Sequence, residues 1–426
     1  MTMIPRRTFL RQGTVAAGLA AQWATRSNAA DANETISVGI MGVKGRGRDL
    51  TQSLVKLKDV NIAYVCDVDE SVIEPTLKVL SDAGRPTPTV VTDFRKILDD
   101  KSVDALVVAT PDHWHAPATI HACLAGKHVY VEKPASHNIV EGRRMVEAAR
   151  KYDRKVQVGT QRRSAEGVAS LVEFLQSGAL GKIHFCRTWI TSMRENIGRA
   201  KDEPTPPGVN YDLWLGAAPN RPFNRNHFHY RWHWFWEYGT GELGNNGIHG
   251  LDLARWGLGV DQPLSVVSSG GKFYFDDDQI TPDTQLVVYE YPGLNLVWEH
   301  RTWSPYGIND SSFGVIFHGE KGILFTDGNI WKVEGVAGVQ PQKIERAGDL
   351  TQKHFANWIQ SIKEDKQPSA DVAIGHASTT LCHIGNISQK LGRRIHWDGA
   401  TEAFTEEDAN SLRAREYRSP WELPKV

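Results

Sequence analysis

Several features that mark particular classes of protein are scarce or missing in this sequence. Cysteine occurs only four times in 426 residues, with no Cys-x-x-Cys pair, which argues against a cysteine-based zinc site and a disulfide framework. Neither sign of charge dominates, because the sequence has 49 basic and 50 acidic side chains. A surface that binds nucleic acid or an anionic membrane is therefore not expected. No apolar run is long enough to span a bilayer. Chemistry on small molecules is the class of function that remains.

The first thirty residues carry the features of an export signal. The arginine pair Arg6 and Arg7 precedes Phe9 and Leu10, and an apolar segment at 13–24 leads to small residues at 27–30. This twin-arginine pattern belongs to a route that exports proteins already folded. We therefore assign residues 1–30 to a signal peptide and expect a periplasmic or secreted protein. A frayed basic N-terminus is the alternative interpretation.

A glycine-rich turn follows the first predicted strand of the mature chain. Residues 35–41 form a short apolar run typical of a buried strand, and apolar positions at 50, 54 and 57 recur at helical spacing. Between them stands Gly42-Val43-Lys44-Gly45-Arg46-Gly47, in which Lys44 replaces the middle glycine of the usual G-x-G-x-x-G pattern. A strand, glycine turn and helix in this order can hold a pyrophosphate at the helix N-terminus. A glycine turn without a ligand is the alternative.

An acidic residue after the next strand indicates which nucleotide is bound. Asp67 follows a strand predicted over residues 60–66 and stands about twenty residues beyond Gly47, a position from which a carboxylate accepts hydrogen bonds from ribose hydroxyls. Asp67 and Asp69 would repel a 2′-phosphate, so NAD is expected rather than NADP.

Further strands are predicted at 105–109, 128–131 and 155–159, with a helix over 117–125. Because the carboxyl ends of parallel strands share one edge of a sheet, the polar residues that follow these strands should face the cofactor. The predicted cofactor-binding residues are Gly42, Lys44, Gly45, Arg46, Gly47, Asp67, Thr110, Pro111, Asp112, His115, Glu132, Lys133 and Gln161. Metal binding by His113 and His115 is the alternative, but no carboxylate or cysteine spacing supports it, and no metal site is predicted.

Together these motifs resemble the glucose-fructose oxidoreductase and inositol dehydrogenase family (Gfo/Idh/MocA). The resemblance rests on the glycine turn, Cys66-Asp67-Val68-Asp69, residues 109–115 and Glu132-Lys133-Pro134, and it resumes at 211–216 and 247–252. It implies an α/β protein with an N-terminal Rossmann domain (31–160), built on a doubly wound parallel sheet. It also implies a C-terminal α+β domain (161–426) with a large, open, mostly antiparallel sheet that often forms oligomer interfaces. Strands are predicted at 183–191, 284–291 and 294–302, and helices at about 352–392 should pack back on the Rossmann domain.

The resemblance places Lys133 nearest the chemistry. Burial can lower the pKa of a lysine at a strand end toward neutrality, so that its amine can take a proton from a sugar hydroxyl. His249 and Asn245 complete the predicted catalytic set. In the family pattern an aspartate stands four residues before this histidine, whereas Asn245 is an amide that can hold a hydroxyl but cannot accept its proton. A solvated loop lysine is the alternative for Lys133.

The densest aromatic stretch covers residues 227–238, after a long irregular segment at 196–226 that is expected to be a lid or subunit arm. Tryptophans at 232, 234 and 236 alternate, which predicts an extended segment with one face packed inward. Aromatic faces rimmed by polar groups suit carbohydrate binding, and ordinary interface packing is the alternative. The predicted substrate-binding residues are Arg163, Tyr230, His233, Trp236 and Glu242.

The sequence thus predicts an exported NAD-dependent oxidoreductase that transfers hydride from a hydroxyl of a sugar, polyol or glycoside. Because no nicotinamide pool renews the cofactor outside the cytoplasm, the NAD should be held tightly and recycled. One alternative is an NAD-dependent glycoside hydrolase or lyase that works by transient oxidation and elimination. A redox-silent NAD-binding scaffold or sensor is the other. A homo-oligomer formed through the C-terminal sheet is expected.

Overall fold

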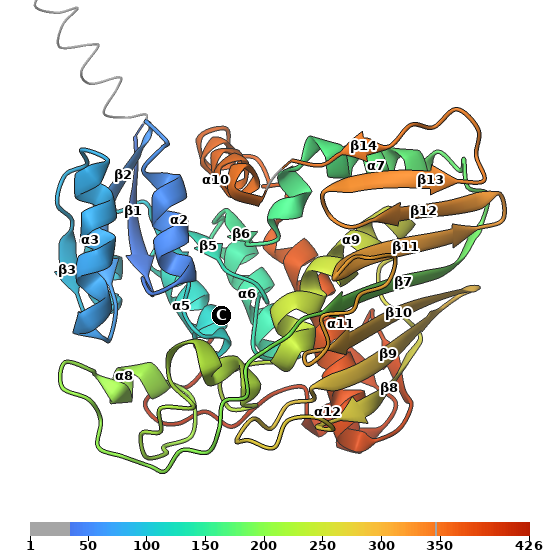
Figure 1. Ribbon diagram of the computed structural model, residues 1–426. Helices are drawn as coiled ribbons and strands as arrows, with labels where there is room; N and C mark the ends of the chain where they lie inside the picture. The colour runs from blue at the N-terminus through green and yellow to red at the C-terminus, as the bar shows by residue number, and fades with distance from the viewer. Residues whose placement is uncertain (1–34, 346) are drawn as a thin grey trace, which may run out of the picture.

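The structure is a computed structural model that describes residues 35–345 and 347–426. The predicted signal peptide lies outside the described residues. Two sheets stand side by side, with the Rossmann sheet at the left of Figure 1 and the C-terminal sheet at the right. This arrangement confirms the predicted fold class.

The N-terminal sheet has six parallel strands in the order β3-β2-β1-β4-β5-β6. Its strands are β1 (Ile36–Met41), β2 (Val60–Cys66), β3 (Thr89–Val91), β4 (Ala105–Val108), β5 (His128–Val131) and β6 (Val156–Val158). The helices α2 (Arg46–Leu54), α3 (Ile73–Asp82) and α10 (Ala347–Lys363) pack on one face; α4 (Arg95–Asp99), α5 (Asp112–Leu124) and α6 (Ile139–Lys151) pack on the other. The strands are apolar almost throughout because helices bury both faces.

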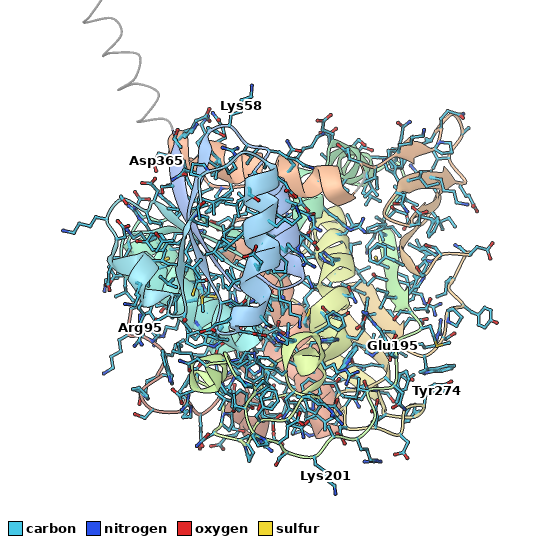
Figure 2. All side chains as sticks on the ribbon, turned by 60° about the vertical axis from the view of Figure 1, so that its left-hand side comes forward. Lys58, Arg95, Glu195, Lys201, Tyr274 and Asp365 are labelled. Atoms are coloured by element: carbon cyan, nitrogen blue, oxygen red, sulfur yellow. The ribbon has the colours of Figure 1, made fainter. Side chains whose placement is uncertain are left out.

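The C-terminal sheet has ten strands in the order β14-β13-β12-β11-β7-β10-β9-β8-β15-β16, and only β7 and β10 pair in parallel. Its strands are β7 (Ile183–Thr191), β8 (Ser265–Gly271), β9 (Thr284–Tyr291), β10 (Leu294–Arg301), β11 (Phe313–Gly319), β12 (Gly322–Thr326), β13 (Ile330–Glu334), β14 (Gln342–Lys343), β15 (Ile395–Asp398) and β16 (Ala403–Phe404). The helices α7 (Glu166–Gln176), α9 (Ile248–Leu258) and α11 (Val372–Leu391) cover one face. On the other face Phe185 and Leu286 are 37% and 43% exposed, and Tyr274 projects from the surface near this sheet (Figure 2).

A long connecting arm, residues 192–238, runs from β7 beneath the Rossmann sheet in Figure 1. It contains α8 (Tyr211–Leu215) and the short helix η3 (His229–Trp234). The prediction of an extended segment over 227–238 was wrong. The chain instead turns back on itself, because its aromatic rings pack with α8 into one buried cluster rather than along one face. The remaining short elements are η1 (Glu70–Val72), η2 (Gln161–Ser164), η4 (Leu243–Gly247) and α12 (Glu407–Ser411).

All four cysteines are buried as free thiols, as the sequence predicts. None of the helices in the described ranges combines the length and apolar character that crossing a bilayer requires.

Candidate active site at the cofactor-binding edge

The glycine turn brings β1, α2 and β4 into close contact. A Cβ on Gly42 would lie 2.7 Å from the Ala109 carbonyl oxygen, and one on Gly47 would lie 1.8 Å from the Gly42 carbonyl oxygen. Gly45 precedes α2 at φ 54° with nothing within 4 Å of its Cβ position, and no side chain caps the helix. The turn therefore leaves open space at a helix N-terminus, which is the shape that a pyrophosphate requires.

Asp67 stands beside this turn at the end of β2. One carboxylate oxygen accepts a hydrogen bond from the Val43 amide at 2.8 Å, and the other accepts one from the Asp69 amide at 3.1 Å. Burial raises the pKa of Asp67, although these amides oppose the shift. Each oxygen keeps a second lone pair, so the carboxylate can still bind ribose hydroxyls.

Buried polar atoms without protein partners collect at the same edge. They are the hydroxyls of Thr110, after β4, and Thr160, after β6, and the amide oxygen of Gln161, none of which has a hydrogen-bond partner among the described residues. Since buried polar groups are nearly always paired in native proteins, these atoms fit a polar ligand such as NAD.

Lys133 follows β5 and reaches η4, a single π-helical turn of the kind often found at functional sites. Its ammonium donates to the backbone carbonyl of Asn245 at 2.7 Å and to the Asn245 side-chain oxygen at 3.3 Å. Burial lowers the pKa of Lys133, and the nearby carboxylates of Glu132 and Asp112 only partly offset this effect. The structure thus brings Lys133 and Asn245 together.

His249 stands in the first turn of α9. Its imidazole forms no hydrogen bond with any residue that the structure describes. Burial lowers the pKa of His249 well below its ordinary value, and the charges of Lys133, Arg162 and Arg46 act in the same direction. The ring is therefore neutral near pH 7, and both of its nitrogens are free for a ligand.

The acids around Lys133 already have partners. Glu132 accepts a hydrogen bond from Arg46 at 2.7 Å, and Glu242 pairs with Arg194 at 3.2 Å. Asp112 accepts the Thr240 hydroxyl at 2.7 Å, and burial raises its pKa to about 7.

Two of the predicted ligand-binding residues, His115 and Arg163, already have protein partners. His115 is buried in α5, and each of its ring nitrogens lies within hydrogen-bonding distance of a backbone carbonyl, Pro134 at 2.7 Å and Thr110 at 3.0 Å. Arg163 is buried against Asp252 and holds both of its carboxylate oxygens at 2.9–3.0 Å. Both side chains fix loops and helices of the site: both ring nitrogens of His115 lie near backbone carbonyls, and Arg163 binds Asp252 through Nε and Nη2.

Some aromatic residues of the arm are exposed and others are buried. The hydroxyl of Tyr230, which is 63% exposed, accepts from Arg194 at 2.8 Å, whereas His233 is buried and has one ring nitrogen without a partner. The ammonium of Lys390 lies 4.4 Å from the centre of the Trp236 ring. One ring face of Trp236 is therefore already covered.

Sequence reasoning assigned no role to two arginines. Arg194 is not predicted because its partner Glu242 is 48 residues away, and no local pattern marks such a pair. Arg162 follows the predicted ligand Gln161 directly, and that adjacency was the available signal.

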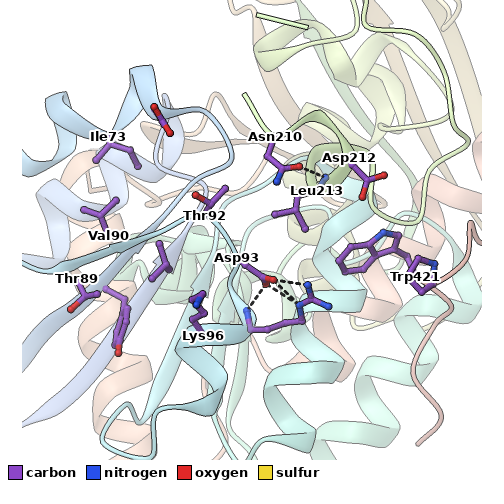
Figure 3. Close-up of a pocket in the computed structure, with 15 residues that line it drawn as sticks. Ile73, Thr89, Val90, Thr92, Asp93, Lys96, Asn210, Asp212, Leu213 and Trp421 are labelled. Atoms are coloured by element: carbon purple, nitrogen blue, oxygen red, sulfur yellow. Dashed lines mark hydrogen bonds and ion pairs between the residues drawn. The ribbon is translucent and has the colours of Figure 1, made fainter. Parts of the chain in front are cut away.

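A broad hollow of about 1240 Å³ lies at the outer edge of the Rossmann sheet. Figure 3 shows Thr89, Val90 and Lys96 on one side and Leu213 and Trp421 on the other. Neither Asp67 nor Lys133 lines this hollow, so we do not assign it to the cofactor.

Comparison with known proteins places the chain in a family. Residues 36–160 match the profile "Oxidoreductase family, NAD-binding Rossmann fold", and residues 187–423 match "Oxidoreductase family, C-terminal alpha/beta domain", both of Gfo/Idh/MocA. A glycosyl hydrolase family 109 protein of Saccharopolyspora erythraea is 36% identical over 128 residues, which cover 29% of this chain and 28% of that protein. An alpha-N-acetylgalactosaminidase of Shewanella oneidensis is 30% identical over 172 residues, which cover 35% of this chain and 38% of that protein. The matches thus span well under half the length of these relatives.

Solved structures share the fold across most of the chain. A levoglucosan dehydrogenase complex with NADH and levoglucosan has a TM-score of 0.67 at 16% identity, covering 85% of this chain and 99% of that one. An aldose-aldose oxidoreductase of Caulobacter crescentus, complexed with glycerol, has a TM-score of 0.65 at 18% identity over the same shares. The chain therefore belongs to the Gfo/Idh/MocA oxidoreductase family, and NAD is the cofactor of its N-terminal domain.

Proposed function

We propose that the protein is an NAD-dependent oxidoreductase that acts on a hydroxyl of a sugar, polyol or glycoside. The observation that carries this proposal is the Lys133 amine, which is anchored at 2.7 Å to the Asn245 carbonyl and has a lowered pKa. A lowered pKa makes it easier for the amine to lose its proton, and the neutral amine can act as a general base.

The residues divide the work as follows. NAD, when bound, would supply a hydride acceptor for the carbon that carries the reacting hydroxyl. Lys133 takes the proton of that hydroxyl, and the neutral ring of His249 orients the same group through a hydrogen bond. Asn245 holds the amine in place.

Asp67 would hold the adenosine ribose of NAD. The amides of the glycine turn would bind the pyrophosphate, and Thr110 and Gln161 would bind the nicotinamide half. The connecting arm favours tight retention of the cofactor, since His229 bonds to Asp69 at 2.7 Å beside the ribose site. Such retention suits an enzyme that recycles its cofactor after export by the twin-arginine route.

A second function is favoured by the relatives named glycosyl hydrolase family 109. In this reaction, oxidation of a ring hydroxyl is transient. The oxidation acidifies the neighbouring C–H, permits cleavage of the glycosidic bond and is then reversed.

The exposed outer face of the C-terminal sheet, where Phe185 and Leu286 lie, supports a homo-oligomer formed through that face.

The test follows the absorbance of bound NADH when the purified protein meets sugars, polyols and glycosides. We expect at least one carbohydrate to reduce the bound NAD, Lys133→Met to abolish this change while NAD stays bound, and Lys151→Met, a change at the surface end of α6, to have no effect. An unchanged rate in Lys133→Met would remove Lys133 from the mechanism. Analysis of the products separates the two functions, because net oxidation indicates a dehydrogenase and cleavage without net oxidation indicates a hydrolase.

A further inference from the structure

Arg162 occupies a site shaped for its guanidinium group. The group lies 4.6 Å from the centre of the Phe313 ring, and Nη1 donates to the Gly328 carbonyl at 3.1 Å. Gly328 has φ +86°, and a Cβ there would lie 2.5 Å from Nη1 and 2.6 Å from Nη2. The planar group is therefore held between an aromatic face and a glycine backbone, in one orientation.

This cation has no acidic partner. No carboxylate of the described residues forms an ion pair with Arg162, and burial lowers its pKa to about 10. Asp327, the acid that opposes this shift, uses its Oδ1 atom to accept the backbone N–H groups of Asn329 and Ile330. The adjacent Arg163, by contrast, forms an ion pair with Asp252. Desolvating a charge without a partner is costly, so an unpaired guanidinium indicates a partner that arrives with a ligand.

Arg162 belongs to the same site as the proposed catalytic groups. The ion pair between Arg163 and Asp252 ties η2 to α9, the helix that carries His249. The positive charge of Arg162 lowers the pKa of His249 together with the charges of Lys133 and Arg46. No acid is among the groups that shift this pKa. A substrate hydroxyl at His249 therefore lies in a positive field. Nε and Nη2 form no hydrogen bond with the residues that the structure describes, and the edge that they share matches the two oxygens of a carboxylate.

We propose that Arg162 determines specificity by binding a carboxylate of the substrate, so that the preferred substrates are acidic sugars such as hexuronic acids and their glycosides. The proposal rests on the proposed function, since it names the substrate class of the same site. A charge-assisted, bidentate contact of this kind is worth on the order of 10- to 100-fold in affinity.

The test compares matched glycosides that differ only at C6, namely methyl β-D-glucoside, the corresponding glucuronide and the 6-sulfate, with their galacto counterparts. We expect kcat/KM of the wild-type holoenzyme to be about 10- to 100-fold higher for one uronide than for its neutral partner. Arg162→Gln should bring this ratio close to one, and Arg162→Lys should give an intermediate ratio. Arg144→Gln removes a charge from the exposed side of α6 and should leave the ratio unchanged.

A wild-type preference for the neutral glycosides, or a uronide preference that survives Arg162→Gln, would overturn the proposal while the proposed function stands. A stronger preference for the 6-sulfate would overturn the carboxylate assignment. If no carbohydrate reduces the bound NAD, the proposed function fails, and calorimetry of D-glucuronate with the holoprotein decides the subsite by itself. Binding that Arg162→Gln abolishes supports the subsite, and binding that is absent or equal in the variant overturns it.

Discussion

Replacing Asn245 with aspartate tests whether Lys133 is the base. The Lys133 amine lies 2.7 Å from the backbone carbonyl of Asn245 and 3.3 Å from its side-chain oxygen. Because the shorter contact is to the backbone, it survives any change of side chain. The substitution therefore adds a negative charge beside an amine whose anchor is retained.

The size of the effect follows from this distance. Two unit charges 3.3 Å apart attract by about 5 kcal/mol at an effective dielectric constant of about 20. Desolvation of the new carboxylate removes part of this energy, and the remainder should raise the pKa of Lys133 above its value in the natural protein. That shift opposes the lowering that burial produces in the natural protein.

The assay is the pH dependence of the single-turnover rate at which a sugar reduces the bound NAD. A base must be neutral to accept a proton, so a higher pKa moves the acidic limb of the profile to higher pH. The rate near neutral pH should fall on the order of 10-fold or more. Asn245→Ala, which adds no charge, should leave the limb close to its original position. If Asn245→Asp leaves the limb in place or moves it to lower pH, Lys133 is not the base.

Three further predictions concern stability and cofactor retention. The pKa of Asp112 is about 7 in the folded protein, against an ordinary value of 3.8. The contribution of Asp112 to the stability of the folded state is therefore complete below pH 3.8 and is lost as the pH rises through about 7. Asp112→Asn should therefore gain stability relative to the natural protein across this window, by up to roughly 4 kcal/mol; a pH-independent difference in Tm contradicts this. Gly47→Ala should lose NAD and much of its thermal stability because its Cβ meets the Gly42 carbonyl, whereas Gly178→Ala, in open space at φ +75°, should cost only about 1–2 kcal/mol; equal Tm shifts would refute the packing argument. His229→Ala removes the 2.7 Å contact with Asp69 and should speed the release of NAD, measured as the fraction retained after gel filtration; unchanged retention would show that the arm does not hold the cofactor.

Local patterns predicted the parts of the fold that depend on neighbours in sequence. The strands predicted at 183–191 and 284–291 agree with β7 and β9 at both ends. Helices cover one face of this sheet, and such strands can be recognised from the alternation of apolar and polar residues in the sequence. The glycine turn was also predictable, because Gly42 and Gly47 are needed by contacts within one strand, turn and helix.

Contacts between distant segments were not predictable. A proline at 117 predicts a helix start, yet α5 begins at Asp112. Its first turn is held by the arm, since the His113 amide donates to Tyr238 and the Trp114 indole donates to Trp214, about 100 residues away. This early start places Asp112 and His115 in a buried first turn of α5. The aromatic stretch folds back for the same reason, because its partners in α8 decide its conformation.

The amide at position 245 is consistent with the state of the other charges at the site. Glu132 is paired with Arg46, Glu242 is paired with Arg194, and the raised pKa of Asp112 removes much of its negative charge near neutral pH. Burial therefore governs Lys133, and its pKa falls. A lowered pKa favours the neutral form of the amine, which is the form that accepts a proton. A carboxylate at 245 would keep the amine charged, so in this chain the amide favours proton abstraction by Lys133.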